Sequence, residues 1–176
     1  MSQTGNGRVN GEVSRLLADA AKYMAQVRYC WLVTESESGG ASARPMGRLT
    51  PEIDDSSCTV CFITDGRTRK ACDIRGGGKV VIIFQHDQDD AFIALSGRAT
   101  LIETAAEVGR RWKDAYDAYY PTEADRANAS FVQISVQRME LWIRGVTPEP
   151  YGLRTTVLER DAKGTWHLSP DIRNAA

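Results

Sequence analysis

Histidine is scarce in this sequence, and neither sign of charge is in excess. The 176 residues hold two histidines, and 22 lysines and arginines nearly balance 23 acidic residues, which gives a net charge of -1. A near-neutral chain has no general attraction for nucleic acid or anionic membranes, so we expect neither as a partner. Long hydrophobic runs are also missing, and none approaches the roughly 18 residues of a membrane span. Recognition of any phosphate group must therefore be local.

Cysteine is present without a metal or disulfide pattern. Neither histidine has ligand spacing to a cysteine pair, so we expect no metal site. Cys58 and Cys61 lie three positions apart on a predicted strand, where their side chains would point to opposite faces. The polar N-terminus has no signal-peptide pattern, so we expect a cytoplasmic protein with reduced thiols.

Length and composition suit a single globular domain. Hydrophobic residues make up 42% of the chain and charged residues 26%, which are ordinary values for such a domain. Apolar residues recur at three-and-four spacing over residues 12–28, a pattern that predicts an amphipathic helix. We expect residues 1–11 to form a disordered lead and residues 12–170 to form the domain.

More of that domain is predicted to be strand than helix. Segments rich in β-branched and aromatic residues, several of them bounded by turn residues, cover 29–34, 41–50, 57–64, 79–86, 91–103, 131–145, 153–160 and 166–168. Two further helices are expected, at 68–75 and at 104–118, the second with a capping box formed by Thr104 and Glu107. Residues 120–129 are expected to be a loop. The pattern is typical of a mainly β protein with some helix, an antiparallel barrel whose openings the helices cover.

The most informative stretch is FITDGRTRK, residues 62–70. A strand ends at Thr64, turns through Asp65 and Gly66, and leads to a helix start that carries Arg69 and Lys70. The first amide groups of a helix lack partners and carry partial positive charge, so a phosphate placed there gains hydrogen bonds and dipole energy. Arginine and lysine add charge-assisted bonds to this anion site. The alternative is a solvated basic turn before a surface helix.

A second segment, ASARPMGRL at residues 41–49, has related features. The residue before a proline is held extended, so Arg44 should project from a strand. Gly47 has no Cβ, and with Pro45 and Met46 it allows backbone to approach a flat ligand closely.

Together the two segments resemble the pyridoxamine 5′-phosphate oxidase-like, FMN-binding split-barrel family. Arg44-Pro45-Met46 matches its first flavin segment, and the residues from Phe62 to Lys70 match its second, with Thr68 where the family usually has Ser. The Arg-Pro-Met variant is more like the general stress protein branch than the vitamin-processing oxidases. The resemblance covers about residues 20–170 and implies a six-stranded antiparallel split β-barrel that binds FMN.

The resemblance also implies roles for individual residues. Arg69 and Lys70 would hold the flavin phosphate, assisted by Arg44 and Thr68, while the backbone at Pro45–Gly47 and at Ile63–Thr64 would meet the edge of the ring. Trp142 on a late strand and Arg154 before the last hairpin stand where the family has flavin-contacting residues. Family members are two-fold homodimers with the flavin at the interface, and we expect the same here.

Departures from the family limit the expected substrate. The vitamin-processing oxidases have a Lys where this chain has Leu49, a Gln where it has Phe92, and an Arg-x-His pair that this chain lacks. A pyridoxine-phosphate substrate is therefore not expected.

No catalytic acid or base is assigned, because no Cys-His pair, Ser-His-Asp order or paired carboxylates emerge from the sequence. The residues favour an FMN-dependent oxidoreductase acting on a small-molecule or nicotinamide substrate. Two alternatives stay open: a flavin-binding stress protein with little turnover, and a split barrel that binds haem or a deazaflavin.

Overall fold

Nine strands form one antiparallel sheet in the computed structural model, which describes residues 4–36, 39–54 and 57–169. Six of them make up the main sheet in the order β2-β1-β5-β6-β7-β4. Their bounds are β1 Cys30–Ser36, β2 Gly40–Met46, β4 Cys58–Asp65, β5 Lys79–His86, β6 Ala91–Ile102 and β7 Ala129–Ile143. The short strand β3, Glu52–Ile53, pairs with β4, and a hairpin of β8, Thr156–Arg160, and β9, Trp166–Leu168, adds to β7. The sheet order is an open path, which confirms the expected split-barrel class.

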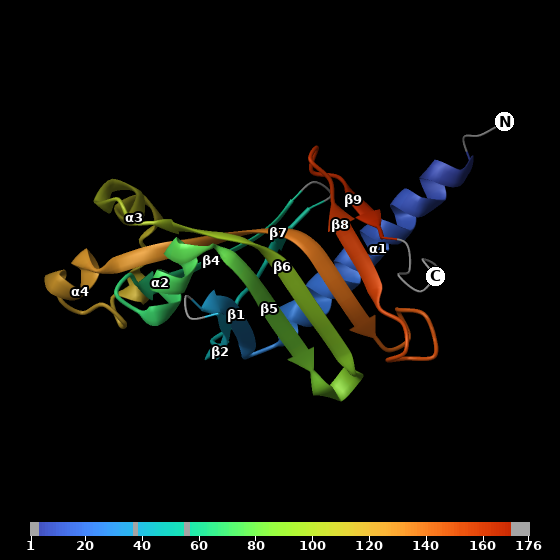
Figure 1. Ribbon diagram of the computed structural model, residues 1–176, viewed down its shortest axis with the longest axis horizontal. Helices are drawn as coiled ribbons and strands as arrows, with labels where there is room; N and C mark the ends of the chain where they lie inside the picture. Colours follow the sequence, from blue (N-terminus) through green and yellow to red (C-terminus); the bar gives the residue numbers. More distant parts are fainter. Residues whose placement is uncertain (1–3, 37–38, 55–56, 170–176) are drawn as a thin grey trace.

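A bulge lets the two longest strands bend. The pairing of β6 with β7 shifts register between Ser96 and Gly97. A Cβ atom on Gly97 would lie 2.2 Å from the carbonyl oxygen of Ser135, so glycine is required where the backbones approach this closely. The bend allows β7 to pair with β6, β4 and β8 along its length (Figure 1).

The first helix is longer than expected. Helix α1 spans Thr4–Gln26, so residues 4–11 are helical rather than a disordered lead, and residues 1–3 lie outside the described residues. Once a helix is nucleated, each residue added to it gains one further backbone hydrogen bond, so a helix can extend into a polar segment. Its apolar face packs against the inner face of the sheet, with Leu16, Ala20 and Met24 in the same core cluster as Leu32 and Ile82. Figure 1 shows α1 crossing behind the strands.

The expected helix at 104–118 is interrupted. Helix α3 covers only Ala105–Arg111 and ends at Trp112, which has extended backbone. The Trp112 ring packs edge-on against Tyr116 and Tyr120, and its Nε1–H donates to Asp117 at 2.9 Å. This aromatic packing overrides the helical preference of the segment.

The capping box lies elsewhere than expected. The Thr104 side chain makes no cap hydrogen bond. The box is formed instead by Thr122 and Asp125, at the start of a short helix α4, Glu123–Ala127, inside the segment expected to be a loop. The remaining helical segments are α2, Arg69–Gly76, and two single turns, Asp87–Asp89 and Asp114–Tyr116.

The two faces of the main sheet differ in how they are covered. Inward side chains such as Leu32, Ile82 and Leu95 are fully buried beneath α1. The alternate side chains point to the other face, where Trp31 is 47% exposed and Val33, Val81, Ile83, Phe92 and Trp142 are exposed or half-buried. This outer face is an apolar surface that the described residues leave partly open to solvent.

Candidate functional site

The start of helix α2 is uncapped. Thr68 occupies the N-cap position, but its side chain makes no cap hydrogen bond; its Oγ1 donates to the carbonyl of Asp65 at 2.7 Å. The first helical amides, those of Arg69 and Lys70, make no hydrogen bond to other described residues. These donors, with the positive end of the helix dipole, are free to bind an anion.

Lys70, the second residue of α2, is partly withdrawn from solvent. It is half-buried, and its pKa is lowered, first by burial and then by the nearby charge of Arg44. Asp65 opposes this shift, but its carboxylate also pairs with the Arg67 guanidinium at 2.6 Å, a contact that lowers the pKa of Asp65. Lys70 thus lies near another cation, and no carboxylate of the described residues forms an ion pair with it within 4.0 Å.

Arg44 reaches the same region from β2. Its Nη2 donates to Thr34 Oγ1 at 2.8 Å and to Asp73 Oδ2 at 3.1 Å. The Arg44 side chain is 18% exposed and that of Asp73 is 5% exposed, so the ion pair is largely buried. Its other terminal nitrogen, Nη1, is buried and has no hydrogen-bond partner in the described part of the chain.

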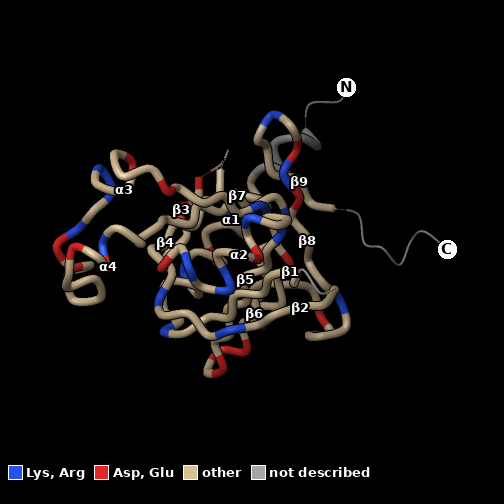
Figure 2. Tube along the Cα trace, turned by 60° about the vertical axis from the view of Figure 1, so that its left-hand side comes forward, with Lys and Arg blue, Asp and Glu red and all other residues tan. Residues whose placement is uncertain are grey.

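Charges of both signs are scattered over the chain rather than gathered on one face (Figure 2). At the start of α2 the balance is positive, because Asp73 offsets Arg44 while Lys70 and the exposed Arg69 add further charge. A buried donor without a partner, two open amides and two adjacent cations are the chemistry that a phosphate group would satisfy. The residues present therefore fit the phosphate of a flavin mononucleotide.

The other predicted residues of this site lie on the same two segments. Thr64 is buried, with its Oγ1 3.5 Å from Thr68 Oγ1. Met46 packs against the main core, and Ile63 packs against a second cluster formed by Val108, Tyr120, Ala129 and Phe131. Pro45 and Gly47 are exposed, and a Cβ on Gly47 would meet no atom within 4 Å, so the space beside it is open.

Trp142 and Arg154 lie elsewhere in the chain. Asp65, just before α2, pairs with Ala129 at the beginning of β7, whereas Trp142 pairs with Phe92 near the end of that strand. Arg154 is exposed in the connection from β7 to β8. Figure 1 shows α2 and this connection at opposite ends of the molecule. Within one chain, therefore, these two residues are not brought to the start of α2.

Sequence reasoning missed Thr34 and Asp73, which hold Arg44. Asp73 follows Lys70 by three residues, so both lie on one face of α2. It is also an acidic residue between the buried Ala71 and Ile74, which is an unusual place for an unpaired charge. From this position in the sequence, a buried partner for Asp73 could have been predicted. Nothing in the sequence identified Thr34.

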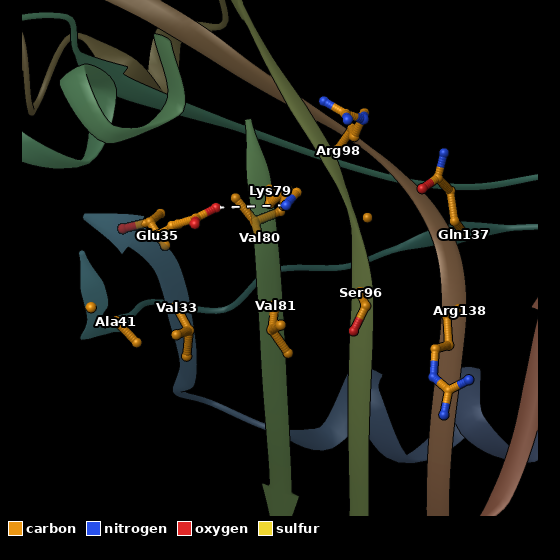
Figure 3. Close-up of a pocket in the computed structure, with 13 residues that line it drawn as sticks. Val33, Glu35, Ala41, Lys79, Val80, Val81, Ser96, Arg98, Gln137 and Arg138 are labelled. Atoms are coloured by element: carbon orange, nitrogen blue, oxygen red, sulfur yellow. Dashed lines mark ion pairs between the residues drawn. The ribbon is translucent and has the colours of Figure 1, made fainter. Parts of the chain in front are cut away.

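A separate hollow of about 530 Å³ opens beside β1, β5, β6 and β7. Val33, Val81 and Ala41 contribute apolar side chains to its wall, and the Lys79–Glu35 ion pair, 3.9 Å, lies on its rim, as Figure 3 shows. Arg98, Gln137 and Arg138 lie on the opposite rim. The hollow shares Thr34 with the Arg44 network but includes neither Lys70 nor Thr68, so it is a different surface from the anion site.

The cysteines confirm the expected divergence of Cys58 and Cys61. Cys58 is fully buried in the core and Cys61 is exposed on the other face of β4. No group of three or more metal-ligating side chains occurs among the described residues. In the same part of the chain, no helix has the length and hydropathy of a membrane crossing.

Comparison with known protein families identifies the family of this chain. The family model described as pyridoxamine 5′-phosphate oxidase like matches residues 17–148. The chain belongs to this family. No curated protein matches the sequence significantly.

Several solved structures share the fold at low sequence identity. A protein from Clostridium acetobutylicum, related to general stress protein 26, is 15% identical with a TM-score of 0.64, over 82% of this chain and 94% of its own. An FMN-binding protein from Nostoc punctiforme, related to pyridoxamine 5′-phosphate oxidase, is 17% identical with a TM-score of 0.61, over 97% of both chains. An F420 reductase is 14% identical with a TM-score of 0.50, over 67% of this chain and 93% of its own.

Proposed function

We propose that this protein binds FMN at the start of α2 and acts as a flavin-dependent oxidoreductase. The observation that carries the proposal is the uncapped helix start beside Lys70 and the incompletely bonded Arg44. Both segments lie within residues 17–148, which match the family model, and they resemble the flavin segments of that family. A phosphate with two negative charges would compensate the positive excess in this half-buried place.

Each residue has a defined task in this proposal. The amides of Arg69 and Lys70 donate to phosphate oxygens, while the Lys70 ammonium and the Arg44 guanidinium supply charge. The exposed backbone at Pro45–Gly47 meets the edge of the ring system, where the open space beside Gly47 leaves room. When bound, FMN supplies hydride or electron transfer, and the protein supplies binding, orientation and electrostatics.

The proposal excludes pyridoxine 5′-phosphate as substrate. Such a substrate needs a second phosphate site facing the flavin. Leu49, which stands where the vitamin-processing oxidases have a Lys, is buried in the main hydrophobic core. A second dianion would lose its hydration near this residue without gaining a cation, which is unfavourable by several kcal/mol.

We further propose that the site is completed in a two-fold homodimer. Trp142 near the end of β7 and Arg154 in the connection that follows are remote from α2 of the same chain, so a second copy would bring them to the flavin. The apolar outer face around Trp31 is a surface that such a copy would bury.

The deciding experiment is the binding of FMN and riboflavin by calorimetry, followed by a visible spectrum before and after addition of NADH or NADPH. We expect one FMN per chain, much weaker riboflavin binding, and bleaching of the bound flavin. Equal affinities would exclude the phosphate site. Tight FMN binding without bleaching by either donor would favour the stress protein alternative. A haem spectrum, or binding of a deazaflavin but not FMN, would favour a split barrel that binds one of those groups instead.

A further inference from the structure

Arg44 is held from one side only. Three hydrogen bonds join three elements: Thr34 Oγ1 on β1 donates to Asp73 Oδ2 at 2.7 Å, and Arg44 Nη2 donates to both Thr34 Oγ1 and Asp73 Oδ2. Thr34 is 1% exposed and Asp73 is 7% exposed, so the two acceptors lie within the protein. Nη2 donates two of these bonds, and the third joins the two groups that accept them. The other terminal nitrogen, Nη1, has no partner among the described residues.

A carboxylate is an unfavourable neighbour for an anion site. By Coulomb's law Asp73 weakens the attraction that Arg44 and Lys70 exert on a phosphate. Lys70 does not explain the presence of Asp73. The two residues lie three positions apart on α2, yet among the described residues no ion pair within 4.0 Å joins them. The two hydrogen bonds that it accepts come instead from Thr34 and Arg44.

We propose that Asp73 is a positioning residue of the phosphate site, which fixes the Arg44 guanidinium so that its second edge is presented to the phosphate. This inference rests on the proposed function. Because a guanidinium is planar, fixing Nη2 also fixes the direction of Nη1. Asp73 lies on the same face of α2 as Lys70, so the helix sets both cationic groups in one geometry. Binding then costs less conformational entropy than it would with a free arginine side chain.

The test is Asp73→Asn, which keeps the shape and removes the charge. If Asp73 only offsets positive charge, this variant binds FMN more tightly than the wild type. If Asp73 positions Arg44, it binds FMN about tenfold more weakly, the effect expected for loss of a charge-assisted hydrogen bond. Riboflavin affinity stays within twofold of wild type, because the network acts on the phosphate. Unchanged or tighter FMN binding overturns the proposal.

A double-mutant cycle separates positioning from a general structural effect. In an Arg44→Ala background, Asp73→Asn should cause no further loss of FMN affinity, because the group it positions is gone. An equal loss in both backgrounds overturns the proposal. Thr34→Val should lower the FMN-to-riboflavin affinity ratio and Thr34→Ser should restore it. Glu103→Gln, which removes the exposed ion pair with Arg75 on the same helix, is the matched control and should leave the ratio unchanged.

The outcomes distinguish this inference from the proposed function. If the wild type binds FMN and riboflavin equally, the phosphate site itself is wrong. If the wild type prefers FMN and Asp73→Asn has the same preference, only the positioning role is wrong. Asp73→Ala is not the primary variant, because it would leave the buried Arg44 without a counter-charge and endanger the fold.

Discussion

Arg44 on β2 and Asp73 on α2 are 29 positions apart in the sequence, yet their side chains form a buried ion pair with a contact of 3.1 Å. The basic residues should therefore contribute unequally to the binding of a phosphate. Much of the positive charge of Arg44 is already offset by Asp73, whereas no carboxylate within 4.0 Å pairs with Lys70 in the described part of the chain. Lys70 should therefore contribute most to the attraction of a phosphate.

This relationship ranks three substitutions. Lys70→Ala should weaken FMN binding by about 1.5–3 kcal/mol, or roughly ten- to a hundredfold, as expected for a charge-assisted contact in a half-buried place. Arg69→Ala should cost less because that side chain is exposed, and Thr68→Ala should cost least because a hydroxyl is a neutral donor. Calorimetric titration with FMN measures all three.

Lys79→Ala is the control for this series, because Lys79 is an exposed lysine that follows the C-terminal end of α2, away from the proposed site at the start of the helix, and pairs with Glu35. It should bind FMN like the wild type. A Lys70→Ala protein that is folded and binds FMN within twofold of wild type would contradict the assignment of the phosphate site.

The lowered pKa of Lys70 predicts how FMN binding depends on pH. Burial and Arg44 favour the neutral amine, and only the charged form attracts the phosphate. The preference for FMN over riboflavin should rise as the phosphate ionises above about pH 6, and it should fall again at a pH below the ordinary lysine pKa of about 10.4. The affinity ratio, measured from pH 5 to 10, removes effects of the shared ring.

Lys70→Arg provides the matched variant for the pH experiment. An arginine stays charged over this range, so the alkaline decrease in the affinity ratio should disappear while the increase near pH 6 remains. An alkaline decrease of the same size in the variant would mean that a group other than Lys70 titrates.

Two buried thiols predict a loss of stability at alkaline pH. Burial raises the pKa of Cys30 from 9.0 to about 11 and that of Cys58 from 9.0 to about 12. A group with a raised native pKa stabilises the fold fully below its unfolded pKa, and this contribution is lost as the pH rises through the native value. The free energy of unfolding should therefore fall between pH 9 and about pH 11 to 12.

Urea unfolding under reducing conditions measures this effect. Each thiol should account for about 2 kcal/mol of the decrease between pH 7 and about pH 10.5, since one pKa unit corresponds to about 1.4 kcal/mol. Cys30→Ala and Cys58→Ala should each be less stable at pH 7 because of the cavity, but should lose less stability on going to high pH. An identical pH dependence in wild type and variants would contradict the role of the thiols.

The sequence predicted the fold well where local patterns determine it. The turn at Asp65-Gly66 and the basic helix start after it are where expected, and six strands of alternating burial form the main sheet. The strand β3 was missed because two residues carry no pattern, and α3 ends early because Trp112 packs with aromatic residues that follow it in sequence.

The site was predicted less completely, for a physical reason. Arg44 and Lys70 were found because they flank recognisable turns and motifs. Their partner Asp73 was not found, because its role depends on how α2 docks against β1 and β2, and Thr34 meets Arg44 only through the antiparallel register of those two strands. Contacts of this kind are tertiary, and no spacing rule within one segment reports them.

The separation of Trp142 and Arg154 from α2 predicts that each flavin site uses residues of two chains. Lys70→Ala removes the phosphate contact from one side of the site, and Arg154→Ala removes the group that we propose comes from the second copy. Each variant alone should bind FMN weakly. When equal amounts are allowed to exchange subunits, mixed dimers should contain one intact site and one doubly altered site.

The fraction of sites that should recover FMN binding can be calculated. With random exchange, half of the dimers are mixed, so about one quarter of all sites should bind FMN with wild-type affinity. If Lys70 and Arg154 served the same site from a single chain, every site would carry a defect and mixing would restore nothing. Trp31→Glu, which places a charge on the apolar outer face, is the companion variant: it should sediment as a monomer and abolish the recovery. Recovery in this monomeric variant, or none between the two exchanging variants, would contradict a shared site.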